Sequence, residues 1–200
     1  MDNVDQQVVE YQRRCVTRHL PEDWAFVQQY CNTSHATALE RSIANSQSDL
    51  VVLLDIDCIP LRAESFTYLH KRATDGTLVG AAQRATHIAN NSHIYVGPFC
   101  MAFSRAVYAE LGSPSFAETE RGDIGEELTY RWEQLRRSIA LMWPSHVERN
   151  RWLLAEKRLF GFGTTYEDLF YHAFCIRDGV TTRTFLAKCK QMLGEASEVE

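Results

Sequence analysis

The stretch that decides the fold is Leu50-Val51-Val52-Leu53-Leu54-Asp55-Ile56-Asp57. Its first five residues are apolar without interruption, which is the pattern of a strand that is buried on both faces. The strand should end near Asp55, because the turn-forming Pro60 follows closely. Strands of this kind occur in parallel sheets that helices cover from both sides. We therefore expect an α/β fold with a central, mostly parallel sheet and helices on both of its faces.

Helical and extended patterns alternate along the rest of the chain. Apolar residues recur at helical spacing from Val8 to Val16 and again after Ser34, which can cap a helix, while residues 24–30 have the composition of a strand. The later patterns predict helices over 64–73 and 126–137, a helix ending at Gly112, a loop over 113–122, and strands over 78–83, 94–96, 99–103 and 139–143. A break at Gly97-Pro98 should separate two of these strands, and Pro144 should close the last.

The composition is that of one globular domain. The chain has 200 residues, of which 45% are hydrophobic and 24% charged, and this is enough to bury a core. A net charge of −5 argues against nucleic acid as a partner, because that surface needs a dense basic patch. We expect a single domain over residues 1–193 and a disordered, acidic tail over residues 194–200.

Neither a membrane anchor nor a disulfide framework is expected. The chain has no apolar run long enough to cross a bilayer, and its start lacks the basic and apolar regions of a secretion signal, so we expect a cytoplasmic protein without a membrane span. The cysteines lack the paired spacing of zinc or redox sites and should be reduced, mostly buried thiols: Cys15, Cys31, Cys58, Cys100, Cys175 and Cys189.

The strongest chemical signal is the pair Asp55 and Asp57 at the end of the buried strand. Residues two apart on a strand face the same way, and ligands of α/β sheets bind beyond the carboxyl ends of strands. Two carboxylates in one crevice repel each other unless a cation compensates them, and oxygen ligands suit Mg²⁺ or Mn²⁺, which bridge phosphate oxygens. The alternative is a pair of solvated aspartates in a turn.

Two later segments also carry candidate residues. Acidic residues gather at a predicted helix start over 122–128, where capping by Asp123 is an alternative to a catalytic role. Two glycines amid aromatic residues over 160–166 predict a mobile loop that covers a ligand, with Gly163 and Thr164 in contact with phosphate or sugar. His172 follows between aromatic residues, as a packed histidine or as a ligand.

The order of elements around residues 50–57 resembles that of the GT-A-fold glycosyltransferases, and the resemblance runs in motif order from Trp24 to His172. It implies a Rossmann-like sheet in which Asp55 contacts the ribose side of the nucleotide and Asp57 ligates Mn²⁺ or Mg²⁺ on the diphosphate. It further implies that His172 completes the metal shell. The family's sheet normally begins with a strand before the first helix, whereas this chain opens in that helix. Either the sheet is one strand short or the nucleotide pocket is built differently.

The same resemblance implies the remaining roles. Glu126 or Glu127, with Asp123 close behind, takes the proton of the acceptor hydroxyl or orients the acceptor. Further contacts to the nucleotide sugar are implied at three positions, His35, Arg41 and Gly97. A position beside the helix cap also explains His35, a solvated helix face explains Arg41, and a strand bend explains Gly97. The implied activity is metal-dependent transfer of a sugar from a nucleotide-diphosphate donor, with a UDP-sugar favoured, to a hydroxyl of an unknown acceptor.

Two other functions fit parts of the pattern. Phosphatases of the haloacid dehalogenase type use a nucleophilic and an acid/base aspartate, which Asp55 and Asp57 imitate, and a later Gly-Asp cluster for Mg²⁺, which Gly122-Asp123 imitates. That cluster should follow a buried strand, but residues 117–121 are polar. The third possibility is a non-catalytic module that binds nucleotide sugars.

Overall fold

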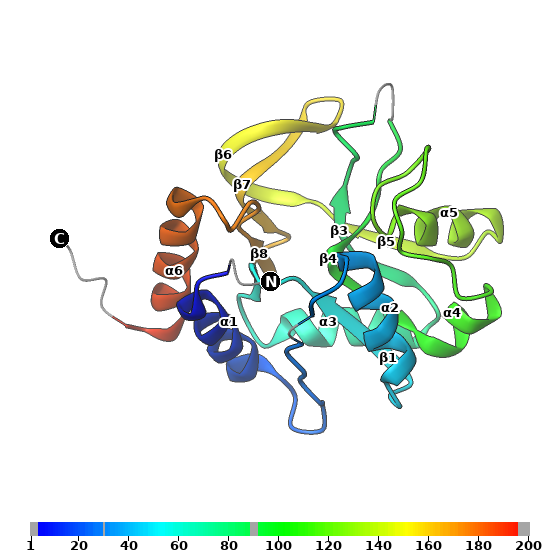
Figure 1. The fold of residues 1–200 in the computed structure, drawn as a ribbon, viewed down its shortest axis with the longest axis horizontal. Coiled ribbons are helices and arrows are strands. Elements are labelled where there is room, and N and C mark those ends of the chain that lie inside the picture. The colour runs from blue at the N-terminus through cyan, green and yellow to red at the C-terminus, as the bar shows by residue number, and fades with distance from the viewer. Residues whose placement is uncertain (1–3, 30, 89–91, 196–200) are drawn as a thin grey trace.

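The computed structural model describes residues 4–29, 31–88 and 92–195, which form an α/β fold with two four-stranded sheets (Figure 1). The helices in these residues are α1 (Gln6–His19), α2 (His35–Asn45), α3 (Glu64–Thr74), α4 (Arg105–Glu110), α5 (Glu126–Gln134) and α6 (Gly179–Leu193). The strands are β1 (Leu50–Leu54), β2 (Cys58–Pro60), β3 (Leu78–Gln83), β4 (Tyr95–Ser104), β5 (Ile139–Met142), β6 (Pro144–Ala155), β7 (Arg158–Tyr166) and β8 (Phe170–His172). No helix of the described residues is both long and apolar enough to span a bilayer.

The first sheet is mixed. The expectation of a mostly parallel sheet is therefore wrong for its hydrogen-bonded pairs. Its order is β1-β4-β3-β5, with β4 antiparallel to both of its neighbours and β3 parallel to β5. The strands β1, β3 and β5 therefore run in one direction, and β4 is inserted against them. An apolar run predicts burial on both faces but contains no information about the direction of the neighbouring strand.

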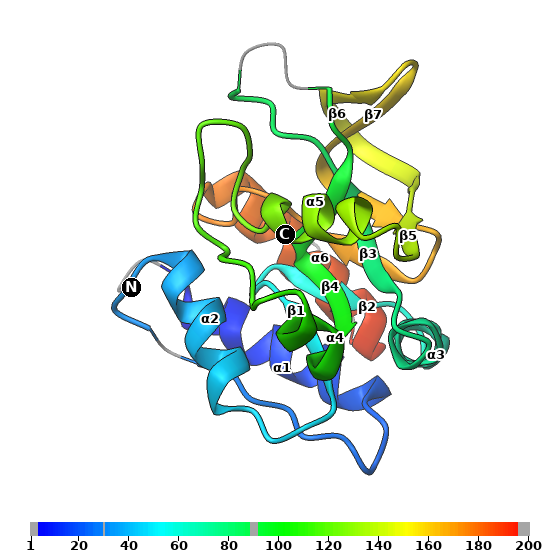
Figure 2. The same cartoon turned by 90° about the vertical axis from the view of Figure 1, so that its right-hand side faces the viewer.

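The second sheet, in the order β2-β8-β7-β6, is antiparallel throughout, and the sequence patterns did not predict it. Pro144 begins β6 instead of closing a strand, and residues 160–166 lie within β7 instead of forming a mobile loop. Two glycines suggested a loop, but both lie within strand β7, where each packs closely against the neighbouring strand β6. The β6/β7 hairpin projects from the rest of the molecule in both views (Figures 1 and 2).

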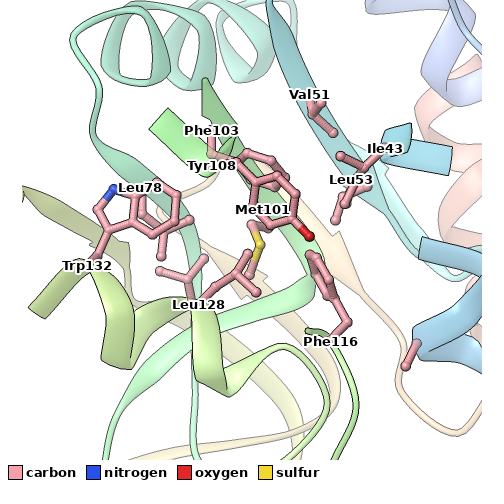
Figure 3. Packing of buried hydrophobic residues seen from close by; sticks show 12 residues of the cluster. Ile43, Val51, Leu53, Leu78, Met101, Phe103, Tyr108, Phe116, Leu128 and Trp132 are labelled. Carbon is pink, nitrogen blue, oxygen red and sulfur yellow. The ribbon is translucent and has the colours of Figure 1, made fainter. Parts of the chain in front are cut away.

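Three layers of side chains hold the sheets and helices together. Helices α2, α4 and α5 cover one face of the first sheet, where Ile43, Leu53, Met101, Phe103 and Trp132 pack in one cluster (Figure 3). The opposite face of this sheet packs against α3 and against residues of the second sheet, and α1 and α6 cover the second sheet with a third cluster. The first sheet is thus covered on both faces, and the expectation of helices on both faces of the central sheet holds for α3 and for the α2, α4, α5 layer.

Several local predictions can be compared with the structure at the start and end of the chain. Ser34 caps α2 as expected, because its hydroxyl accepts a hydrogen bond from the Thr37 amide at 3.2 Å. Residues 24–29 form no strand, and Tyr30, the end of that prediction, lies outside the described residues. Glu195, expected in a disordered tail, pairs with Arg14 and accepts a hydrogen bond from the Tyr11 hydroxyl, while residues 196–200 lie outside the described residues.

The predicted break at Gly97-Pro98 is an irregularity within one strand. The partners of Gly80 and Ala82 on β4 are Met101 and Val96, so β4 carries additional residues between these two pairs. Such a bulge bends a strand and redirects its side chains. Gly80, on the neighbouring strand β3, packs against this bulge. A β-carbon there would overlap the Cys100 carbonyl oxygen and a Val96 methyl group.

We therefore expect Gly80→Ala to lower the free energy of unfolding by about 3 kcal/mol, at the upper end of the cost of overpacking a core. Gly112→Ala is the matched control, because Gly112 has a φ of +82° but no atom within 4 Å of an added β-carbon. Left-handed strain alone should cost the control about 1 kcal/mol. Urea unfolding of both variants measures the difference, and equal losses would contradict a close-packed bulge.

Candidate metal and substrate site

Asp55 and Asp57 lie on a tight turn that takes the chain from the first sheet to the second. The Asp55 amide donates to the Phe99 carbonyl at 3.0 Å, and the Cys58 amide donates to the Asp55 carbonyl at 3.0 Å. The two aspartates therefore follow β1 and precede β2, and they do not share the face of a strand. Their carboxylates nevertheless converge, because the turn returns Asp57 toward the end of β1.

His172 is brought to Asp57 by the pairing of β2 with β8. Cys58 and His172 are register partners, and the Ala173 amide donates to the Asp57 carbonyl at 3.0 Å. The His172 Nε2 lies 3.1 Å from the Asp57 Oδ1, and the two side chains are only 5% and 8% exposed. Residues that are 115 positions apart in the sequence thus meet in a buried pair.

Aromatic rings fix the orientation of the His172 imidazole. Phe99 stacks on it with a centroid distance of 4.0 Å and an interplanar angle of 13°, and Phe174 lies at 3.8 Å from it. The His172 Nδ1 is buried without a hydrogen-bond partner. Phe174 and Cys175 have φ angles of 58° and 50°, which is a strained conformation for such residues and is frequent at binding sites.

Asp55, Asp57 and His172 fit a divalent cation. One ligand atom from each of these residues lies within 4.8 Å of the other two. An octahedral ion with ligands at about 2.1 Å separates its ligand atoms by about 3 to 4.2 Å, so small side-chain rotations close this set around an ion. Two carboxylates and one imidazole suit Mn²⁺, which accepts nitrogen more readily than Mg²⁺ does, and three protein ligands leave positions for substrate oxygens.

His35, the first residue of α2, is a second partner of Asp55, with its Nε2 3.1 Å from the Asp55 Oδ1. This hydrogen bond raises the pKa of His35 despite its partial burial. Burial raises the pKa of Asp55, but the hydrogen bond and charge of His35, together with the charge of His172, outweigh burial and leave that pKa lowered. Asp55 is therefore held as a carboxylate.

These residues surround a pocket of about 230 Å³ that contains three carboxylates. No lysine or arginine is among the described residues that line it: His35, Asp55, Asp57, Gln83, Tyr95, Pro98, Phe99, Asp123, Ile124, His172, Phe174 and Cys175. His35 offsets part of the charge of these three carboxylates, which still repel one another, and a bound cation would relieve this repulsion. The charge of the pocket and the positions of the candidate ligand atoms therefore both favour a bound cation.

Asp123 is the acidic residue of segment 122–128 that faces this pocket. Its Oδ2 accepts a hydrogen bond from the Tyr95 hydroxyl at 3.0 Å, and its Oδ1 accepts one from the Ile124 amide at 2.7 Å. Both bonds fix the direction of the carboxylate. Asp123 is not the cap of α5, because Gly125, with a φ of 76°, occupies that position.

Glu126 and Glu127 do not line the pocket. Glu126 is fully buried, and its Oε2 accepts a hydrogen bond from the Asp123 amide at 2.9 Å while its Oε1 lies 2.7 Å from the His93 Nδ1. Glu127 pairs with Arg121 and Arg131 on the outside of α5. In the described conformation, both glutamates hold the segment in place, and Asp123 alone of the three faces the pocket.

The other residues that were expected to contact the nucleotide sugar do not line the pocket. Gly97 backs onto two lining side chains, Phe99 and Gln83, which a β-carbon would overlap. Gly163 packs against Glu148, and the Thr164 hydroxyl is buried and donates to the Gly161 carbonyl at 2.7 Å. Arg41 is exposed on α2. The strand β7 thus uses Gly163 and Thr164 for its own hydrogen bonds and packing.

The sequence analysis missed several lining residues, of which Gln83 is the most informative. Its side-chain oxygen is buried and has no hydrogen-bond partner, so a donor group of a ligand would satisfy it. A polar residue directly after the apolar run 78–82 was the available signal. Phe99 and Phe174 gave no comparable signal, because aromatic residues are frequent in any core.

Comparison of the chain with models of protein families, with curated proteins and with solved structures finds no match.

The cluster around His93 predicts a pH dependence of stability. Burial lowers the pKa of His93, but hydrogen bonds to Glu126 and Glu133 outweigh burial and raise the pKa above its ordinary value of 6.5. A histidine whose pKa is higher in the folded state than in the unfolded state stabilises the fold when it is protonated. This stabilisation is complete below pH 6.5 and is lost as the pH rises through the pKa of the folded state. Each unit of increase corresponds to about 1.4 kcal/mol.

We expect His93→Gln to be destabilising at pH 6 and less so at pH 8.5, as measured by urea unfolding. His146→Gln, at an exposed histidine on β6, is the control and should retain the pH dependence of the unsubstituted protein. A loss from His93→Gln that is the same at both pH values would show that this histidine contributes only packing.

Proposed function

We propose that this protein is a metal-dependent glycosyltransferase that moves a sugar from a nucleotide-diphosphate donor to an acceptor hydroxyl. The observation that carries the proposal is the convergence of Asp55, Asp57 and His172 in a pocket that also contains Asp123. Each of these residues has the chemistry that the resemblance to GT-A enzymes implies for it. The chain's α/β fold, with β1 leading into the aspartate turn, is compatible with the proposal.

The proposed roles follow from the surroundings of each residue. Asp57, His172 and Asp55 would hold Mn²⁺ or Mg²⁺, and such a cation, when bound, offsets negative charge on the departing nucleoside diphosphate. His35 holds the Asp55 carboxylate toward the pocket. Gln83 offers its unpartnered oxygen to a hydroxyl or amide of the donor.

Asp123 is the residue that we propose as the general base. Its carboxylate lies in the pocket and is oriented by Tyr95 and the Ile124 amide, whereas Glu126 and Glu127 are engaged elsewhere. An acceptor hydroxyl within hydrogen-bond reach of Asp123 would lose its proton to the carboxylate as it attacks the sugar carbon. If the enzyme retains the anomeric configuration, the same carboxylate orients the acceptor instead.

The two rival functions use the same residues differently. A phosphatase of the haloacid dehalogenase type needs Asp55 as a free nucleophile, but its Oδ1 lies 3.1 Å from the His35 Nε2. In such an enzyme the first sheet would also be expected to pair in parallel around the nucleophile, whereas β1 pairs with the antiparallel β4. A binding module without turnover would need the same metal and donor but no base.

The metal site is tested by titrating Mn²⁺ into the protein and following thermal unfolding, with and without a panel of sugar nucleotides. We expect Mn²⁺ to raise the Tm, and a UDP-sugar to raise it further in the presence of Mn²⁺. Asp57→Asn should weaken Mn²⁺ binding at least tenfold, because the ion loses a charged ligand. Asp75→Asn, at an exposed aspartate at the end of α3, is the control and should leave binding unchanged.

Three outcomes would count against the proposal. Full metal-dependent transfer by Asp57→Asn would exclude the assigned metal site. Hydrolysis of simple phosphate esters without any response to sugar nucleotides would favour the phosphatase. Metal-dependent binding of a sugar nucleotide without any product would favour the binding module.

The role of Asp123 is tested by Asp123→Asn, which keeps the shape of the side chain and removes its basicity. We expect kcat to fall by about 10² to 10⁴, the usual contribution of a general base, while Mn²⁺ binding is retained. Glu127→Gln, with its side chain outside the pocket, should change kcat by only a few-fold. A larger loss with Glu127→Gln than with Asp123→Asn would reassign the base.

A further inference from the structure

Strand β6 carries two arginines whose charge is not neutralised by a carboxylate in the described part of the chain. Arg149 and Arg151 are exposed on β6, and neither has a carboxylate oxygen within 4.0 Å in the described part of the chain. By contrast, the structure pairs Arg14, Arg121, Arg131 and Arg137 with glutamates. Arg149 and Arg151 lie two residues apart on strand β6.

Aromatic rings hold both guanidinium groups in place. The Arg149 guanidinium lies over the Phe162 ring at 5.6 Å, and that of Arg151 lies over Phe162 at 5.3 Å and over Trp152 at 5.4 Å. A ring face attracts the charge of a guanidinium but cannot accept two parallel N–H bonds as a carboxylate does. The capacity of both arginines for bidentate hydrogen bonds is therefore open, and their positions are restrained in advance.

The same rings connect the arginines to the candidate metal site. Trp152 contacts Phe174 with a centroid distance of 5.6 Å, and Phe174 contacts His172 at 3.8 Å. Phe174 and the following Cys175 line the pocket. The charge of Arg151 also acts on Cys175, where it opposes the increase in pKa that burial causes. Arg151 thus lies near Cys175 at the edge of the pocket lining, and Arg149 shares the Phe162 ring with it.

We propose that Arg149 and Arg151 bind the negatively charged group of an acidic sugar acceptor while its hydroxyl enters the pocket. This inference rests on the proposed function for the statement that the ligand is an acceptor sugar. Charge complementarity carries the choice of an acidic sugar, because two guanidinium groups without a carboxylate partner favour an anion, whereas the carboxylate-lined pocket favours the neutral hydroxyl of the same sugar. Trp152 and Phe162 add partly exposed aromatic surface beside the guanidinium groups, and this surface suits a sugar ring.

The experiment compares tri-galacturonate with its fully methyl-esterified form, which has the same sugar backbone without the charges. Binding is measured by calorimetry at low salt, without metal ion and without donor, so that no turnover is required. We expect the charged trisaccharide to bind at least about tenfold more tightly than the neutral one, and added salt to reduce this preference. Arg149→Gln combined with Arg151→Gln should abolish the preference, while thermal unfolding shows that the variant is folded.

A control double variant removes the same charge elsewhere on the hairpin. Lys157 and Arg158 line a separate hollow of about 330 Å³ between β6 and β7, together with residues such as Asn150. Lys157→Gln combined with Arg158→Gln should leave tri-galacturonate binding within about twofold of the unsubstituted protein. An equal loss in both double variants would overturn the proposal, because it would show a general effect of positive charge.

Two further outcomes separate this inference from its alternatives. Binding to vesicles that contain phosphatidylglycerol, without any binding of tri-galacturonate, would replace the acidic sugar by a membrane surface. If sugar transfer is found but the charged trisaccharide binds no better than the neutral one, the inference fails and the proposed function stands. If the charge preference is found and lost as expected in a protein that transfers no sugar, the arginine site stands and the proposed function fails.

Discussion

The pairing of Asp57 with His172 is the interaction on which the rest of the site depends. It joins the turn after β1 to the end of β8, and the bond from the Ala173 amide to the Asp57 carbonyl fixes the backbone of the same two segments. A side-chain pair that is this deeply buried needs compensation for lost hydration. A divalent cation would supply that compensation, so the geometry of the two sheets and the chemistry of the proposed metal are linked.

Negative charge lies in the pocket around this pair, and unpaired positive charge lies outside the pocket. Asp55, Asp57 and Asp123 make the pocket anionic, while His35 compensates Asp55 from α2. Free positive charge is found outside the pocket, on the β6/β7 hairpin that projects from the body of the molecule (Figure 1). In the proposed enzyme, the pocket would therefore receive the cation and its diphosphate, and the hairpin would receive an anionic part of the second substrate.

The three candidate metal ligands could be singled out from the sequence because each of them carries a local signal. Asp55 and Asp57 end an uninterrupted apolar strand, and His172 lies in a short aromatic segment. The structure gathers these three residues within 4.8 Å. The choice among Asp123, Glu126 and Glu127 could not be predicted, since all three are acidic residues at one helix start. Which of them faces the pocket depends on Gly125, on the partners of Glu126 and on the rotation of α5 against β4.

The sequence by itself determined the strand β1, the cap of α2 and the residue types of the candidate metal ligands, because periodicity, capping and ligand chemistry are local properties. Only the tertiary structure decided that β4 lies antiparallel between β1 and β3 and that residues 160–166 form a strand instead of a loop. Strand direction and pairing depend on contacts between residues far apart in the chain. The same apolar run or glycine-containing segment is compatible with several partners until those contacts form.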